Sequence, residues 1–225
     1  MKVYLDGNLY DTTDIAQAGA NGSEFLIGGR NNSPLQLFNG QLSNFKIFNV
    51  ELTQAQVHEL YHNPEMVIPT GVSASNLRRH YPLCAFNDTS GFGGRHESDQ
   101  GVEGVNGEYG GSPVMSFAQP VPCPQLGLQQ SATRLRFPGG STTHNAVATT
   151  AALGTTASVS CWFQVENTSS TRVLWAIGNA TGTGFLEVFV NSSDQLQVYG
   201  QSAFTIATIT DSDWHHLVVT TDSGS

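Results

Sequence analysis

The chain has 225 residues, of which 18 are Asp or Glu and 9 are Lys or Arg, so its formal net charge is −9. No basic stripe is present, and a phosphate backbone would be repelled, which excludes nucleic acid as a partner. No apolar run approaches the ~20 residues of a membrane helix, and the opening MKVYLDGNLY reaches a charged turn too early for a signal peptide. The length suits one large all-β domain or two small ones and is enough to bury a core.

The N-terminal region predicts strands joined by tight turns. Residues 2–10 have apolar positions on both sides of an Asp6-Gly7 pair, which is typical of a hairpin. Residues 24–30 (EFLIGGR) predict a short strand that closes in a Gly-Gly loop.

A longer strand follows within residues 35–52, where polar and apolar residues alternate. The alternation sets Leu42, Asn44 and Lys46 against Phe45 and Ile47. We therefore expect one apolar face and one face in contact with water.

Residues 52–62 (LTQAQVHELYH) predict the one helix. Thr53 is the expected N-cap, and Gln56 three residues later completes a capping box. Val57, Leu60 and Tyr61 form a stripe that would pack against a sheet, and Pro64 would end the helix.

The rest of the chain is a linker followed by more strands. Residues 63–77 contain prolines, a glycine and small polar residues and predict a linker, residues 78–86 a strand, and residues 87–113 a long Gly-rich excursion. Seven further strands are expected at 134–140, 158–165, 172–178, 185–191, 195–200, 204–209 and 215–221. This pattern predicts an all-β fold, an antiparallel β-sandwich with one short helix.

Four segments carry a family resemblance: VYLDGNL (3–9), the stretch from Phe38 to Tyr61, SVSCWF (158–163) and DWHHLVVTTD (213–222). Together they resemble the laminin-G-like branch of the concanavalin A-like jelly rolls. The resemblance implies a jelly-roll sandwich, a fold that hosts lectins, glycosidases, adhesion modules and structural repeats.

The order of these segments differs from the family pattern. In such domains the W-H-H strand is soon followed by the Y-x-D-G strand, whereas here the first closes the chain and the second opens it. We therefore expect the strand at 215–221 to pair antiparallel with residues 3–5, within one chain or between chains. Residues 1–66 would supply the C-terminal part of a domain, 67–77 a linker and 78–225 the N-terminal part.

Two origins account for this order. The chain is either a circular permutant, whose ends lie together as domain termini often do, or a window cut out of phase from a tandem array. The connector at 68–83 resembles those between domains of bacteriophage tail and capsid-appendage proteins.

The sequence offers little support for a catalytic site or for a metal site formed by adjacent histidines. Glu97, Asp99 and Glu103 have a spacing superficially like that of glycosidases, but they lie in a Gly-rich stretch without strand alternation, so we expect a solvated loop and no enzyme. His215 and His216 are adjacent in a strand and face opposite sides, so they cannot jointly hold one ion.

The aromatic and thiol side chains have more ordinary expectations. Trp162, Trp175 and Trp214 are expected in the core. Cys84, Cys123 and Cys161 lack CxxC spacing and are expected as buried or loop thiols, or as a Cys84–Cys123 disulfide with Cys161 buried.

The resemblance also implies a Ca²⁺ site at a D-x-S-G turn. Asp88 and Ser90, with Asn87 beside them, would offer oxygen ligands in a Gly-permissive loop. Asn44 stands where the family often has an acid, which removes a charge. The alternative is a plain Asx-turn.

For a glycan the best-placed side chains are Phe92, His96 and Tyr109 in the 87–113 region, because loops at one end of a sandwich are where binding surfaces are built. We expect a non-catalytic module that binds a glycan or host cell surface, on a virion surface appendage or an extracellular protein. The alternatives are a structural spacer or assembly domain, whose partner is a tandem neighbour or a strand-swapped copy, and a glycoside hydrolase or lyase relative.

Overall fold

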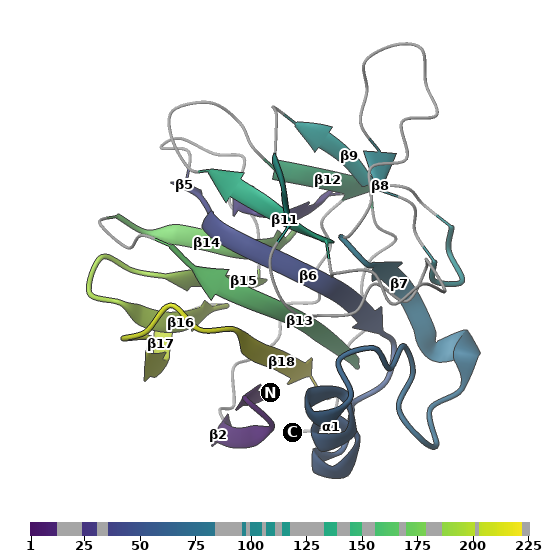
Figure 1. Cartoon of the computed structure of the whole chain (residues 1–225). Helices are drawn as coiled ribbons and strands as arrows, with labels where there is room; N and C mark the ends of the chain where they lie inside the picture. Colours follow the sequence, from purple (N-terminus) through teal and green to yellow (C-terminus); the bar gives the residue numbers. More distant parts are fainter. Residues whose placement is uncertain are drawn as a thin grey trace.

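The computed structural model describes residues 1–12, 24–30, 36–83, 96–97, 100–104, 107–110, 114–117, 133–138, 145–149, 156–166, 170–178, 186–200 and 203–221. Two antiparallel eight-stranded sheets pack face to face, and one helix lies outside the first sheet (Figure 1). No helix of the described part is long and apolar enough to span a bilayer. The expected antiparallel sandwich with one short helix is confirmed.

The strands of sheet A run in the order β10 (Val114–Phe117), β11 (Thr133–Pro138), β6 (Asn39–Phe48), β13 (Ala157–Val165), β18 (His215–Thr221), β1 (Lys2–Leu5) and β2 (Asn8–Thr12), with β7 (Leu77–Tyr81) also paired to β6. The strands of sheet B run in the order β17 (Ala203–Thr208), β16 (Gln195–Tyr199), β15 (Leu186–Val190), β14 (Arg172–Ile177), β3 (Glu24–Ile27), β12 (Asn145–Thr149), β9 (Gly107–Gly110) and β8 (His96–Glu97). A small ladder joins β4 (Gly29–Arg30) to β5 (Gln36–Leu37). Strands from the first 48 residues therefore lie inside both large sheets.

The two ends of the chain pair with each other. β1 runs antiparallel to β18 in the register Lys2↔Thr220, Val3↔Val219, Tyr4↔Val218 and Leu5↔Leu217. The hairpin that continues into β2 turns at Asp6 and Gly7, whose φ angles are 50° and 78°. Positive φ at both turn residues is what a two-residue hairpin needs and what Asp-Gly tolerates. The expected pairing of the closing strand with residues 3–5 is confirmed within one chain.

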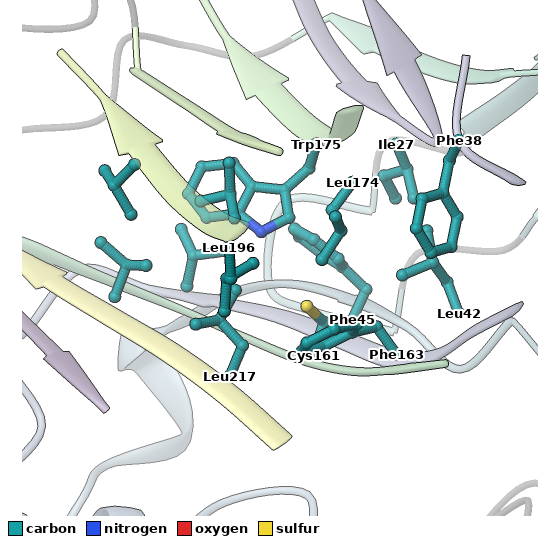
Figure 2. Packing of buried hydrophobic residues seen from close by; sticks show 14 of the residues in the cluster. Ile27, Phe38, Leu42, Phe45, Cys161, Phe163, Leu174, Trp175, Leu196 and Leu217 are labelled. Atoms are coloured by element: carbon teal, nitrogen blue, oxygen red, sulfur yellow. The ribbon is translucent and has the colours of Figure 1, made fainter. Parts of the chain in front are cut away.

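The main core lies between the sheets (Figure 2). Trp175 of β14 is fully buried and meets Phe45 of β6 edge-on at 6.3 Å between ring centroids. Phe25 of β3 lies 5.0 Å from the same Phe45 ring. Cys161 of β13 is buried in this core as a free thiol, and burial raises its pKa to about 12. Trp175 and Cys161 thus occupy the core, as the sequence predicts.

A bulge in β6 changes the face of part of that strand. Leu42 and Phe45 are three residues apart, yet both lie in the core between the sheets. The pairing with β13 shifts register at this point, and Asn44 has φ 51°. An extra residue in one strand reverses the alternation that follows it. Strict alternation predicted that Leu42 and Lys46 share one face of the strand, and this prediction is wrong.

The outer face of sheet A is covered rather than wet, which corrects the expectation for β6. Asn44 and Lys46 are each 2% exposed. The cover consists of α1 (Gln54–His62) and residues 63–77, which end in the short 3-10 helix η1 (Ala74–Asn76). A second apolar cluster lies beneath it and comprises Tyr4, Phe48, Leu52, Val57, Leu60, Leu77 and Val218, with Met66, Val67, Ile68 and Val72 packed on it. Residues 63–77 therefore pack on the sheet, which their linker-like composition does not indicate.

The helix has the capping box that its sequence predicts. Gln56 donates its backbone N–H to Thr53 Oγ1, and Gln56 Oε1 accepts from the Thr53 N–H. Val57 and Leu60 are buried, and Tyr61 stacks on Trp162 with 5.8 Å between ring centroids. Trp162 and the half-buried Trp214 therefore belong to a separate cluster on the outer face, not to the main core.

Four strands fall where the sequence predicts none, namely β8, β9, β10 and β12. Residues 100–104 also run along β7, because Gln100 and Val102 donate their N–H groups to the carbonyls of His80 and Leu77. A Cβ on Gly101 would lie 2.4 Å from the Arg78 carbonyl oxygen, so this close approach requires glycine. Part of the Gly-rich excursion is thus sheet structure.

Candidate functional site

A row of polar side chains is buried on the outer face of sheet A, beneath α1 and residues 63–68. Its members are Asn44, Lys46, His80, Ser160 and His216, all at most 2% exposed. They come from the adjacent strands β7, β6, β13 and β18, and the register sets Lys46 opposite both His80 and Ser160. Sequence reasoning missed this row because the polar half of each alternation is typical of a solvent face.

Asn44 and His80 form one end of the row. Asn44 Nδ2 donates to the Pro64 carbonyl at 2.6 Å, and Asn44 Oδ1 lies 2.9 Å from His80 Nε2. Burial, followed by the charge of Lys46, lowers the pKa of His80 to about 3. The imidazole is therefore neutral, and its Nε2–H donates to Asn44. The Asn44 amide therefore links the His80 side chain of β7 to the Pro64 carbonyl in the segment that follows α1.

Lys46 occupies the middle of the row. Its ammonium nitrogen donates to the Met66 carbonyl in the segment that covers it. Burial lowers the pKa of Lys46 to about 7, and the carboxylate of Glu65 opposes that shift. A lysine is an unusual occupant of a covered sheet face.

Ser160 and His216 form the other end. Ser160 Oγ lies 2.9 Å from His216 Nε2, a separation at which a histidine activates a serine nucleophile. The pair is covered, however, because the His216 ring lies 5.0 Å from the Trp162 ring and 6.2 Å from the Tyr61 ring, and these two rings stack on each other. Burial lowers the pKa of His216 to about 3, with a smaller contribution from Lys46. The arrangement orients rings beneath α1 and presents no nucleophile to solvent.

His215 faces the other way and joins the two ends of the chain. Its Nδ1 lies 2.8 Å from Asp6 Oδ2 and its Nε2 lies 2.9 Å from Asp211 Oδ1. The hydrogen bond to Asp6, aided by the charges of both carboxylates, raises the pKa of His215 against the opposing effect of burial. The two adjacent histidines therefore lie on opposite faces of β18, as the sequence predicts.

Two of the three predicted glycan residues, His96 and Tyr109, lie in the strands at one edge of sheet B. His96 of β8 pairs with Glu108 of β9, and the next residue, Tyr109, pairs with Ala146 of β12. The backbones of His96 and Tyr109 thus lie on neighbouring strands. Phe92 lies outside the described residues.

The structure describes two of the three carboxylates considered for catalysis, and these two have different surroundings. Glu97 lies in β8, where it pairs with Gly107, and Asp99 lies outside the described residues. Glu103 binds two arginines: Oε1 accepts from Arg78 Nε at 2.6 Å, and Oε2 lies 2.6 Å from an Arg79 guanidinium nitrogen. Glu103 therefore stabilises the packing of residues 100–104 on β7.

The expected calcium ligands are only partly within the described chain. Asn87, Asp88 and Ser90 lie outside it, and Asn44 is buried with its amide oxygen already bonded to His80. Among the described residues, no three His, Cys, Asp or Glu side chains are grouped to hold a metal. Calcium ligation stays a prediction, and Asn44 fits it poorly.

The two antiparallel sheets and the one α-helix of the described residues form a concanavalin A-like β-sandwich. Residues 1–58 match the family model described as the concanavalin A-like lectin/glucanases superfamily. The match covers the opening hairpin, β6 and the start of α1, which hold one of the four segments of the sequence resemblance and most of a second, whereas the segments 158–163 and 213–222 lie outside it. Comparison with curated proteins and with solved structures found no match.

Proposed function

We propose that the chain is a non-catalytic module that binds a carbohydrate or a host cell surface. One observation carries the proposal: residues 1–58 match a superfamily described by lectins and glucanases, and the described strands form the corresponding sandwich. Because this fold hosts unrelated functions, the site has to be argued from residues.

Of the three carboxylates considered for catalysis, Glu103 is the one whose side chain the structure describes, and its contacts favour binding over hydrolysis. Glu103 holds Arg78 and Arg79, and its side chain is 17% exposed. Both carboxylate oxygens of Glu103 are engaged by guanidinium groups, whereas a glycosidase needs a pair of carboxyl groups that face the scissile bond.

The proposed binding surface is the edge of sheet B formed by β8 and β9, two strands of the 87–113 stretch. His96 and Tyr109 lie on neighbouring strands there. Aromatic side chains bury large areas at low entropic cost, and Tyr and His keep a polar group for sugar hydroxyls. A Ca²⁺ held by Asn87, Asp88 and Ser90 would lie in the same stretch of sequence and is proposed as an accessory. We place the module on a virion surface or an extracellular protein, where glycans are met.

A glycan array, read with the folded protein, tests this function. We expect binding that falls at least about tenfold in Tyr109→Ala and in His96→Ala, corresponding to about 1.4 kcal/mol each. Tyr10→Ala is the matched control, because Tyr10 is an exposed aromatic (53%) of β2 on sheet A. Arrays with CaCl₂ and with a chelator, together with Asp88→Ala, test the ion. A folded chain that binds no glycan, or that loses binding equally in the Tyr10 control, contradicts the proposal.

A structural repeat is the second candidate, and the β1–β18 ladder favours it. That ladder joins strands from opposite ends of the sequence, so the same pairing is available between copies of the chain. Size-exclusion chromatography with light scattering decides between the candidates. A monomer with glycan binding supports the module, and a concentration-dependent oligomer without binding supports the repeat.

A further inference from the structure

Helix α1 carries two exposed histidines one turn apart. His58 and His62 are four residues apart, which places them on the same face of the helix. Their ring centroids are 6.0 Å apart, with the ring planes at 88°. Within the described part of the chain, neither imidazole has a hydrogen bond or an ion pair. The two rings are thus adjacent, accessible and available to a ligand.

The helix holds this pair on a rigid base. The capping box fixes the first turn at Thr53, and the buried Val57 and Leu60 anchor the opposite face. A Cβ on Gly7 would approach His58 to 3.3 Å and Tyr61 to 3.1 Å, so the β1–β2 turn packs directly against this part of the helix. Little backbone freedom is therefore lost when both rings bind one ion.

The sequence of this turn, His58-Glu59-Leu60-Tyr61-His62, has the spacing of the zinc motif H-E-x-x-H. The glutamate does not have the role it has in that motif. Glu59 Oε2 accepts the Thr70 N–H at 2.6 Å and fixes residues 63–70 to the helix. The geometry therefore points to metal binding without hydrolysis.

We propose that His58 and His62 form a two-histidine site for a divalent transition ion of the Zn²⁺, Ni²⁺ or Cu²⁺ type. Imidazole nitrogens suit these ions and form bonds of about 2.0–2.1 Å to Zn²⁺. Water completes the coordination. Mg²⁺ and Ca²⁺ prefer oxygen ligands and are not bound here.

Isothermal titration calorimetry with ZnCl₂ and with NiCl₂ alone, on the whole metal-free chain, tests the proposal. We expect one site that loses at least about tenfold in affinity in His58→Gln and in His62→Gln, since even the loss of a group behind a metal ligand costs 10–100-fold. Excess MgCl₂ should not compete.

A matched variant preserves the number of histidines and breaks their spacing. Ala55→His combined with His58→Gln leaves two exposed histidines seven residues apart, about 10.5 Å along the helix, too far to share an ion. We expect it to bind as weakly as His58→Gln alone. The proposal is wrong if the parent chain binds neither ion, if both single variants bind like the parent, or if the spaced variant binds like the parent.

Discussion

His215 Nδ1 lies 2.8 Å from Asp6 Oδ2, so the last described strand is bonded to the turn of the first hairpin. The backbone adds two contacts to the same turn. His216 donates its N–H to Asp6 Oδ1 and accepts the Asp6 N–H at its carbonyl, each at 2.8 Å. Asp6 therefore closes the β1–β18 ladder at its end.

The ion pair of His215 makes a pH-dependent contribution to stability. Its pKa is raised above 6.5, so the contribution is fully present below about pH 6.5 and is lost as the pH rises through the higher folded-state value. His215→Gln should lower the free energy of unfolding by about 1 kcal/mol at pH 6, a modest loss because both carboxylates are partly exposed. The loss should be smaller at pH 9, where less of the imidazole is charged. Urea unfolding at the two pH values measures this. His62→Gln, on the surface of α1, is the control, and an equal loss at both pH values would refute the prediction.

His216 responds to pH in the opposite sense. Its folded-state pKa is lowered to about 3, so between pH 6.5 and 3 the unfolded chain takes up a proton that the native chain does not. Stability therefore falls as the pH falls through this window. His216→Gln should cost about 1–3 kcal/mol at pH 7 through the lost hydrogen bond to Ser160, and should make the loss between pH 7 and 4.5 smaller than in the parent. An undiminished acid dependence in urea unfolding would count against the buried neutral imidazole.

Lys46 predicts a gain in stability at alkaline pH. Its pKa falls from 10.5 in the unfolded chain to about 7 in the folded one, so the unfolded chain binds more protons between these values. The free energy of unfolding should rise with pH over this range, by at most about 1.4 kcal/mol per pH unit. Lys46→Met should remove that rise while preserving the side-chain volume. Urea unfolding of parent and variant at pH 7, 8 and 9 provides the comparison, and identical slopes would mean that Lys46 is not buried in its neutral form.

The local elements were predictable because short-range chemistry decides them. The Asp6-Gly7 turn, the Thr53–Gln56 capping box and the apolar stripe of α1 depend on residues within one or two turns of each other, and all are as expected. The antiparallel β1–β18 pairing was predicted from the order of the family motifs and is confirmed, and the structure adds its register.

The covered face of sheet A was not predictable in the same way. Asn44 and Lys46 alternate with apolar neighbours as solvent-facing residues do, and residues 63–77 have the composition of a linker. Only the fold shows that carbonyls of Pro64 and Met66 in that segment accept hydrogen bonds from these side chains. The bulge at Asn44 depends equally on pairing with β13, which is distant in sequence. Of the candidate glycan residues, the structure describes the backbones of His96 and Tyr109 and assigns them to neighbouring strands.

The N-cap of α1 contributes measurably to the stability of the helix that covers sheet A. Thr53→Ala should lower the free energy of unfolding by about 1 kcal/mol, because the Gln56 N–H loses its side-chain acceptor. Thr53→Ser restores an acceptor and should stay close to the parent. Chemical unfolding monitored by tryptophan fluorescence measures both, since Tyr61 of α1 stacks on Trp162. A serine variant as unstable as the alanine variant would indicate that the methyl group, and not the cap, is responsible.

The central claim is that the first and last described strands close the sandwich within one chain, and a designed disulfide tests it most directly. Val3 and Val219 are paired in the β1–β18 ladder and both lie in the core, at a separation that suits a cross-strand disulfide. After mild oxidation of the Val3→Cys/Val219→Cys chain, mass spectrometry of the monomer should find the two engineered positions linked. The shifted pair Tyr4→Cys/Val219→Cys should not link, because its side chains lie on opposite faces of the sheet. A link found only between chains, or formed equally by the shifted pair, would contradict the account.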